Sequence, residues 1–262
     1  MRLRAYFVCS LAAMVLPAAT VSQKWSSAQQ EKFLLNGRIV SAGEAGKGIT
    51  GTKKAMMTDG RNTHAVHIQF IDQYMPLFKG KDGSTEEDFK DTWKFNVAAW
   101  RLAKLLHLTD MTPACVARPV DGKPASVCWW LDDIAMDEKE RLAKNIQPPD
   151  VAAWNRQMDS IRVFDQLIYN MDRSQENLLI ANDWRAYMID HTRAFRKWTK
   201  LRNAAAITKC SPELLRALQA LRREDVARDL GEFLTPAEID GLMARRDLIV
   251  AKLTVTLPAG QF

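Results

Sequence analysis

The sequence predicts an α+β protein of two lobes, in which a small antiparallel sheet with one helix precedes a mainly helical part. Three observations predict this order. Short β-type runs separated by turn residues occupy 33–70, a helical pattern and a second hairpin follow to about Leu131, and helical periodicity dominates from Val151 onward. With 262 residues and 47% apolar side chains, the chain can bury a core in one large domain or two lobes.

The start of the chain has the order of a secretory signal. Arg2 and Arg4 precede an apolar run, and small residues follow it. A membrane anchor is the alternative, but the run from Ala5 to Ala19 is shorter than the ~20 residues that a span needs. We therefore expect residues 1–22 to be a signal peptide. The mature protein should then be exported, to a periplasm, the exterior or a secretory pathway, with no stable membrane span.

Three cysteines remain after the signal, which takes Cys9 with it. Cys115, Cys128 and Cys210 form no C-x-x-C pair. A disulfide between Cys115 and Cys128 requires that their strands pair, and the alternative is buried free cysteine. Both readings stay open from the sequence.

The basic residues are spread along the chain. The formal net charge is +6, and +4 without Arg2 and Arg4. A nucleic-acid footprint concentrates Lys and Arg into a stripe with aromatic residues between them, which is not the pattern here. We expect no nucleic acid among the partners.

The first lobe, taken as 23–131, should contain two hairpins and a helix. Asp59-Gly60 between two β-type runs is a strong hairpin signal, and Asp121-Gly122 is a second one. Ser84 and Glu87 have the spacing of a capping box, which predicts a helix from there to about Leu106. The expected strands are 33–40, 52–57, 63–70, 111–120 and 125–131.

In the second lobe, taken as 132–262, a long helix should follow Pro148 and Pro149. Short strands, 178–183 and 186–190, then flank a turn at Asn182-Asp183, which puts Asp190 at a strand end. Two N-cap signals, Ser211-Pro212 and Thr235-Pro236, predict helices beyond. The apolar face of the long helix is expected to contain Val151, Trp154, Met158, Ile161, Phe164 and Ile168.

Asp172, Asn177 and Asp190 are the candidate site, because they stand five and then thirteen residues apart. Phosphoryl transfer by a kinase needs a carboxylate that orients the attacking hydroxyl, an amide five positions on, and a second carboxylate after the following strand. Asp172 would be the catalytic base, and Asn177 with Asp190 would hold Mg²⁺ or Mn²⁺ through oxygen ligands. The ordinary alternative is that all three are turn and capping residues.

A glycine-rich segment precedes this site in the chain. Gly46, Gly48 and Gly51 fit G-x-G-x-x-G, and the segment lies between two expected strands rather than before a helix. That placement favours a lid over nucleotide phosphates against a dinucleotide-binding fingerprint, although glycines also close ordinary hairpins.

With these residues in view, NMDRSQENLLI followed by MIDHTRAF resembles the D-R-x-x-x-N and I-D segments of the atypical kinase superfamily. That group includes phosphatidylinositol 3- and 4-kinases, HipA-type kinases, spore-coat CotH kinases and secretory-pathway casein kinases. The likeness covers about 46–195 and implies a protein-kinase-like fold with a cleft between the lobes. Arg173 would orient the catalytic segment.

The sequence departs from the family at two positions. Where a kinase third strand carries V-A-I-K, this chain has V-H-I-Q, so Gln69 stands in place of the lysine. Asn96 stands where the family's helix carries Glu. The usual ion pair would become a neutral amide pair. Lys53 or Lys54 could replace the lost ammonium, and only one of them can face the cleft because side chains alternate along a strand.

Other residues near the expected hinge are weaker candidates. Trp129 or Trp130 could stack on a purine, although core packing of one and exposure of the other is the commoner outcome. The histidines His64, His67, His107 and His191 lack the spacing of a zinc site.

These expectations amount to an ATP-dependent phosphotransferase, or one using another nucleoside triphosphate, that acts on a hydroxyl of a protein, glycan or small molecule. Two alternatives remain. The first is a pseudokinase that binds a nucleotide or partner, since Gln69 and Asn96 replace charged residues. The second is a nucleotidyltransferase on the same fold.

Overall fold

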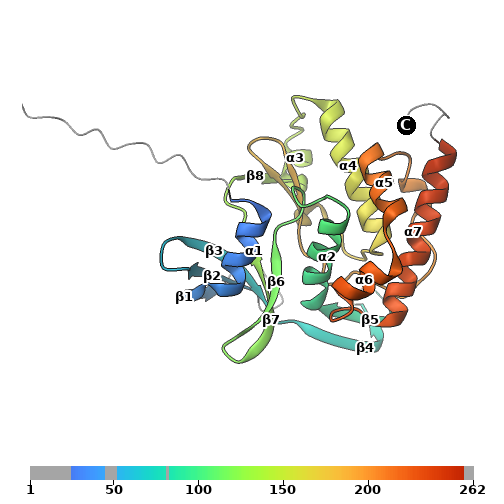
Figure 1. The fold of residues 1–262 in the computed structure, drawn as a ribbon. Coiled ribbons are helices and arrows are strands. Elements are labelled where there is room, and N and C mark those ends of the chain that lie inside the picture. The colour runs from blue at the N-terminus through green and yellow to red at the C-terminus, as the bar shows by residue number, and fades with distance from the viewer. Residues whose placement is uncertain (1–24, 45–51, 81–82, 257–262) are drawn as a thin grey trace, which may run out of the picture.

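The computed structural model describes residues 25–44, 52–80 and 83–256. Its architecture is α+β, with antiparallel sheets mainly in the first half of the chain and helices mainly in the second, which confirms the predicted class. In Figure 1 the strands β1 to β3 lie on the left and the helices α4, α5 and α7 on the right. The elements are α1 Ser27–Asn36, β1 Arg38–Glu44, β2 Lys53–Thr58, β3 Thr63–Gln69, β4 Asp72–Lys79, β5 Thr85–Thr92, α2 Lys94–Leu105, β6 Cys115–Val120, β7 Lys123–Trp129, β8 Ile134–Asp137, α3 Glu138–Ala143, α4 Val151–Leu167, η1 Gln175–Asn177, β9 Leu178–Ala181, β10 Ala186–Met188, η2 Ala204–Ala206, α5 Pro212–Ala220, α6 Arg223–Leu230 and α7 Pro236–Thr256.

The largest sheet has five strands in the order β1-β2-β3-β7-β6. Both hairpins predicted from Asp-Gly turns are present, β2–β3 and β6–β7. The second turn has φ of 51° at Asp121 and 74° at Gly122, the left-handed pair that a tight hairpin requires. Pairing of β3 with β7, with Val66 opposite Trp129, joins the two hairpins into one sheet.

The second hairpin contains a disulfide. Cys115 and Cys128 lie directly opposite each other in the register of β6 and β7, and their sulfur atoms are bonded. Of the two readings left open by the sequence, the structure has the cross-linked one. Cys210 is free and partly buried.

The expected strand from Phe33 is wrong in its first part, because Phe33 and Leu34 lie in helix α1. The helix begins at a capping box, in which the Ser26 hydroxyl accepts from the backbone N–H of Gln29 and the Gln29 side chain accepts from that of Ser26. Phe33 and Leu34 are buried, and α1 packs on β6 and β7. Strand β1 starts only after Gly37.

The expected helix start at Ser84 is also wrong. Residues 85–92 form strand β5, which pairs along its length with β4 in a two-stranded hairpin. Asp88 has φ of 53°, which a right-handed helix does not contain. The long-range ladder with β4 therefore prevails over the local capping pattern of Ser84 and Glu87. Helix α2 starts later, at Lys94, and buries Val97 and Trp100.

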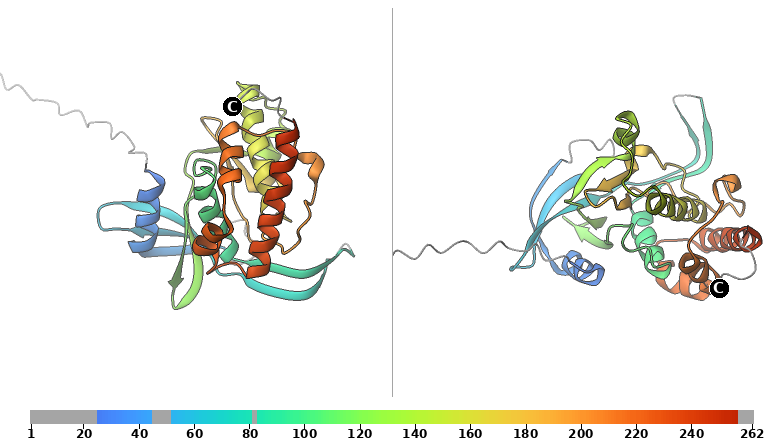
Figure 2. Two further views of the ribbon diagram at one scale, coloured as in Figure 1. Left: turned by 45° about the vertical axis from the view of Figure 1, so that its right-hand side comes forward. Right: turned by 90° about the horizontal axis from the view of Figure 1, so that it is seen from above.

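The β4–β5 hairpin extends beneath the helical part. Figure 2 shows it projecting as a long arm beyond the body of the molecule. Its base is attached to the chain beyond β10 by a backbone hydrogen bond of 3.0 Å from the N–H of Thr92 to the carbonyl of Thr192. This contact brings β5 next to the Asp190 segment.

Helix α4 is the predicted helix after the two prolines. Asp150 caps it, accepting a hydrogen bond of 2.9 Å from the backbone N–H of Ala153. Trp154 and Phe164 are buried as expected, whereas Val151 is 55% exposed and does not belong to the buried face. The predicted N-caps Ser211 and Thr235 also stand at the starts of α5 and α7.

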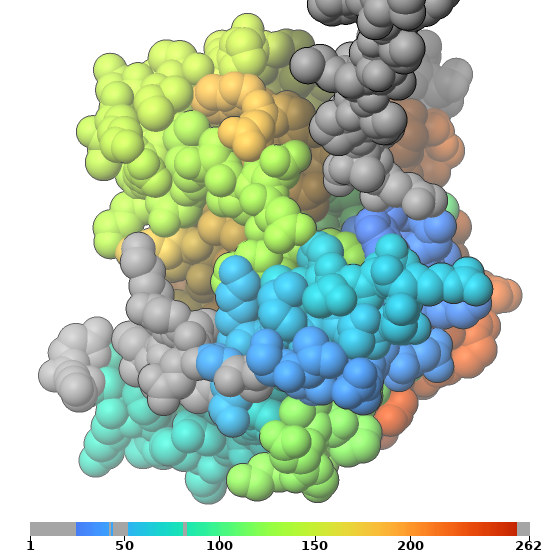
Figure 3. Space-filling view, turned by 90° about the vertical axis from the view of Figure 1, so that its left-hand side faces the viewer, coloured from blue at the N-terminus to red at the C-terminus, as the bar shows by residue number. Residues whose placement is uncertain are grey.

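A three-stranded sheet, in the order β10-β9-β8, lies beside these helices. Its β9–β10 hairpin is the one predicted around Asn182-Asp183. Seen from the side of β1 to β3, those strands (blue to cyan) lie below, and the chain of β8, α3 and β9 (yellow-green to gold) lies above (Figure 3). None of the helices in the described ranges is long and apolar enough to cross a membrane.

Candidate functional site

The segment that contains Asp172 follows α4 directly. Its first turn is held by Asn170, whose amide donates to the Asp165 carboxylate at 2.9 Å and whose side-chain oxygen accepts from the backbone N–H of Asp172 at 3.0 Å. The carbonyl of Asp172 accepts from the N–H of Ser174 at 2.8 Å. The backbone around Asp172 is thus fixed while its side chain stays half exposed at 52%.

Arg173 holds this segment to the β9–β10 hairpin, as its predicted orienting role requires. Its guanidinium forms an ion pair with Asp165 at 3.0 Å and donates to the carbonyls of Asn177 at 2.7 Å and Ile189 at 2.8 Å. It also contacts Nε2 of His191 at 3.1 Å. Burial, and secondly the charge of Arg173, lower the pKa of His191 well below its usual value, so the imidazole is neutral and accepts this hydrogen bond.

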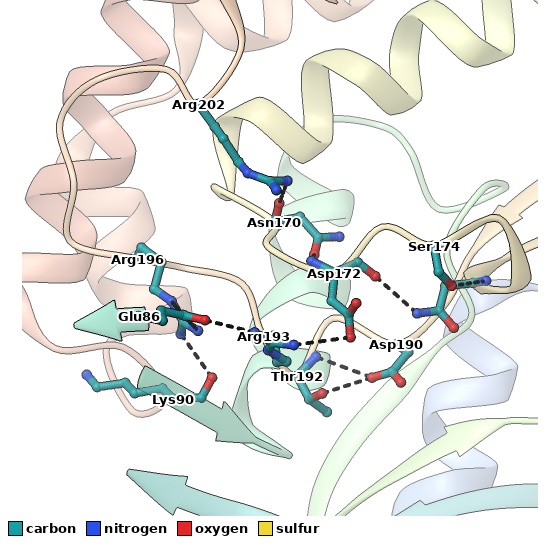
Figure 4. A network of polar contacts seen from close by, with 11 residues as sticks. Glu86, Lys90, Asn170, Asp172, Ser174, Asp190, Thr192, Arg193, Arg196 and Arg202 are labelled. Atoms are coloured by element: carbon teal, nitrogen blue, oxygen red, sulfur yellow. Dashed lines mark hydrogen bonds and ion pairs between the residues drawn. The ribbon is translucent and has the colours of Figure 1, made fainter. Parts of the chain in front are cut away.

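Asn177 and Asp190 are brought to Asp172 by the ends of β9 and β10. The Asn177 amide donates to the Asp172 carbonyl at 3.2 Å, and the carbonyl of Asn177 accepts from the N–H of Ile189 at 3.1 Å. Figure 4 shows the carboxylates of Asp172 and Asp190 on neighbouring turns, facing the same space. The three residues named from their spacing therefore lie together.

The carboxylates of this region influence one another. Burial raises the pKa of Asp172, Arg193 lowers it, and the negative charge of Asp190 raises it again. Asp91, at the end of β5, has a pKa raised by burial first and also by Asp190 and Asp172. Three acidic side chains from three segments thus share one electrostatic environment.

The donor set fits a hard divalent cation. Asp190 accepts from the Thr192 hydroxyl through Oδ1 at 3.0 Å, and the Asn177 amide nitrogen is engaged with Asp172, which leaves an oxygen on each for a metal. Within the described ranges, no group of three or more His, Cys, Asp and Glu side chains has metal-binding geometry. Mg²⁺ suits two protein oxygens, since it keeps several waters and binds substrate phosphates.

Lys54 lies on the face of the sheet that also carries His67 and Gln69. Lys54 is directly opposite His67 in the β2–β3 register, and Gln69 is two residues further on, so all three share a face. Burial lowers the pKa of His67, and the Asp190 carboxylate raises it, so this face is close enough to feel the Asp190 charge. Lys53, opposite Ile68, belongs to the other face.

The two amides that replace charged family residues have different neighbours in the described ranges. Gln69 Nε2 donates to the Thr52 hydroxyl at 3.3 Å, and Asn96 Oδ1 accepts from the backbone N–H of His191 at 2.8 Å. The expected pair of Gln69 with Asn96 is not among these contacts. Asn96 instead joins α2 to the residue that follows Asp190.

The two tryptophans at the end of β7 differ in environment. Trp129 is buried and packs on Phe33 and His64, with the His64 ring stacked at 3.6 Å. Trp130 is partly exposed, and the Lys54 ammonium lies 4.1 Å from its ring centre. Trp130 therefore stays a candidate for stacking on a base, and Trp129 serves the core. Gly46, Gly48 and Gly51 lie outside the described residues.

Several residues of the site had no sequence signal. Arg193 lies 3.8 Å from the Asp172 carboxylate and forms an ion pair with Glu86 on β5 at 2.8 Å. Asp91 follows on the same strand. The capping pattern suggested a helix for 85–92, and no local pattern places Glu86 or Asp91 beside Asp172.

Two hollows elsewhere do not belong to this site. One of about 250 Å³ is lined by Gln157 and Trp184, and one of about 440 Å³ by Glu31 and Arg101. Neither includes Asp172, Asn177 or Asp190, so hollow size alone would have pointed away from the convergent polar residues.

No protein-family model matches the sequence, and no curated protein matches it. Among solved structures, the chain is similar to the Helicobacter pylori proinflammatory kinase CtkA, at 10% sequence identity and a TM-score of 0.47, over 82% of this chain and 94% of that chain.

Proposed function

We propose that the chain is a kinase-like, metal- and nucleotide-dependent phosphotransferase that moves the terminal phosphoryl group of a nucleoside triphosphate, ATP in the simplest case, to a hydroxyl. The observation that carries the proposal is the convergence of Asp172, Asn177 and Asp190 at the ends of α4, β9 and β10. The order of sheet, helix, hairpin and helices is the kinase order and supports the same reading.

Each residue has a defined task in this reaction. Asp172 orients the acceptor hydroxyl and takes its proton as the acceptor oxygen bonds to the terminal phosphorus. The bond from that phosphorus to its bridging oxygen breaks, and the nucleoside diphosphate leaves with the electron pair. Asn177 and Asp190 would hold Mg²⁺ or Mn²⁺, which when bound neutralises phosphate charge.

The sheet supplies the nucleotide side of the site. Lys54 faces the same way as Gln69, and its ammonium lies over the Trp130 ring. In this proposal the lysine leaves the ring for the phosphates, which opens the tryptophan to a base. In this proposal 23–131 is the nucleotide-binding lobe and 132–262 the catalytic lobe. Gly46, Gly48 and Gly51 would cover the phosphates.

We further propose that the protein works after export. The signal-like residues 1–22 support this, and so does the Cys115–Cys128 disulfide, because disulfides form and persist in oxidising compartments. The acceptor would then be an exported protein, a glycan or a small molecule.

One observation favours a second candidate, a pseudokinase that binds a nucleotide or partner. Neither Gln69 nor Asn96 carries the charge that the usual lysine and glutamate provide, which removes one contact to the phosphates.

Labelled nucleotide separates these functions. The mature protein is incubated with Mg²⁺ or Mn²⁺ and ATP labelled at the α- or the γ-position. Transfer of γ-label to an acceptor is expected, and its loss in Asp190→Ala but not in the control Asp247→Asn, whose carboxylate is 69% exposed on α7, supports the site. Transfer of α-label means a nucleotidyltransferase. Thermal stabilisation without either transfer means a binding module.

A further inference from the structure

Arg193 is a cation at the site, three residues after Asp190. Its side chain is 26% exposed, and Nη1 lies 3.8 Å from Asp172 Oδ2, beyond direct hydrogen-bond distance. Nη2 donates to Glu86 at 2.8 Å, and the guanidinium lies over the Phe89 ring at 5.1 Å. Figure 4 shows it between Glu86 and Asp172. The side chain is thus held in place from β5.

Two nitrogen atoms of the Arg193 guanidinium make no direct hydrogen bond to the described residues. Arginine has five N–H groups, and the Nε group of Arg193 is buried without a hydrogen-bond partner among the described residues. Nη1 faces Asp172 without a direct hydrogen bond. Because the side chain is 26% exposed, Nη1 is the group that an anionic ligand beside Asp172 could reach.

Several carboxylates lie near Arg193. Asp172 and Asp190 lie there, and Asp91 feels both of their charges. A terminal phosphate entering this region would meet carboxylates on several sides. On the sheet side, β3 has the neutral Gln69 in place of a lysine and Lys54 of β2 faces the same way, so a cation on the segment of Asp190 would add to the single positive charge from the sheet.

We infer that Arg193 is a further catalytic residue, which donates hydrogen bonds through Nη1 to the transferred phosphoryl group and supplies the charge that β3 lacks at Gln69. This inference rests on the proposed phosphotransferase function. Glu86 acts as the positioning residue, because it fixes Nη2 and leaves Nη1 directed at the space beside Asp172. A donor fixed before the reaction stabilises developing charge without reorganisation.

The contact predicts discrimination between nucleotides. ATP places its terminal phosphate near Asp172, whereas ADP lacks that group. Replacing Arg193 with Met should weaken ATP binding or turnover by about 10- to 100-fold, the range expected for a charge-assisted hydrogen bond, and change ADP binding by less than about threefold. Arg193→Lys keeps the charge but not the planar fork, and an intermediate loss is expected.

The experiment measures the affinities of the mature protein for MgATP and MgADP by titration calorimetry, and γ-phosphate release by single turnover. A matched control is Arg185→Met, an arginine at the β9–β10 turn that pairs with Asp183 at 3.4 Å. If Arg193→Met does not fold, Arg193→Lys carries the same comparison. An ATP-selective loss with unchanged control behaviour supports the inference.

Two results overturn it. Equal changes in ATP and ADP affinity, or none, mean that Arg193 only ties β5 to the catalytic segment. The second is ATP selectivity that is lost in Glu86→Gln but kept in Arg193→Met, because the selectivity would then belong to the β4–β5 hairpin, whose Glu86 also accepts from Arg196. If the unaltered protein binds neither nucleotide, the proposed function itself is wrong and the inference falls with it. Nucleotide binding without ATP selectivity at Arg193 leaves the proposed function standing.

Discussion

Replacing Arg173 with Met should strongly destabilise the segment that contains Asp172. The Arg173 and Asp165 side chains are 15% and 11% exposed, and the arginine also binds the carbonyls of Asn177 and Ile189. Without it, a carboxylate stays nearly buried and unpaired, and two carbonyls lose a charged donor. Breaking a buried ion pair from one side costs about 3–5 kcal/mol.

A cost of about 3–5 kcal/mol is a large part of the free energy of unfolding of a protein. Folded domains are stable by roughly 5–15 kcal/mol, and in a chain of this size each 1 kcal/mol lowers the melting temperature by about 2–4 °C. We therefore expect Arg173→Met to melt about 10 °C lower. It should also lose phosphoryl transfer, because Asn177 and Asp190 both depend on the backbone that Arg173 holds.

Urea unfolding followed by tryptophan fluorescence measures the free energy. The control is Arg216→Met, whose ion pair with Glu213 is exposed at 59% and 69%, so its loss should cost less than about 1 kcal/mol. A double variant with Asp165→Asn should recover part of the stability, because the stranded charge is removed. A loss for Arg173→Met no larger than that of the control would refute the reasoning.

Three further predictions concern the site and its sheet. Burial raises the pKa of Asp172, so the acid limb of turnover against pH should lie above that of an ordinary aspartate. A raised folded-state pKa gives stability that is present below the unfolded pKa and lost as pH rises through the folded one, so Asp172→Asn should raise the free energy of unfolding at pH 7 while abolishing transfer. Reducing the disulfide between Cys115 and Cys128, which are 13 residues apart, should cost about 3 kcal/mol, measured by urea unfolding with and without reductant. Lys54→Met should weaken nucleotide binding in calorimetry, whereas Lys53→Met, on the opposite face, should not.

The parts of the fold that were predicted correctly have short-range causes. The Asp-Gly turns define both hairpins of the sheet, and Asp150 with the apolar period defines α4. The spacing of Asp172, Asn177 and Asp190 transfers directly into proximity, because β9 and β10 form a tight hairpin that returns the chain. Local pattern and tertiary structure agree at these places.

The failures have long-range causes. Ser84 and Glu87 satisfy a capping pattern, yet residues 85–92 form a strand because they pair with β4, which the periodicity of a single segment does not reveal. Glu86 meets Arg193 across 107 residues of sequence, and no local motif marks either partner. The start of α1 was missed for a different reason, since its cap at Ser26 lies upstream of the apolar run that suggested a strand.

Under the proposed function, the position of Arg193 gives a physical reason why Gln69 in place of a lysine need not end catalysis. A lysine on β3 would approach the phosphates from the sheet, and its distance to the metal ligands would vary with any motion between the sheet and the helical part. Arg193 belongs to the same segment as Asp190 and is tied through Glu86 to β5, whose end is bonded to Thr192. In the proposed reaction Arg193, Asp190 and Asp172 would then move as one unit. In this proposal the charged phosphate contact comes from Arg193, on the segment of Asp190, instead of from a lysine at position 69 of the sheet. The sheet would then hold the nucleotide less tightly.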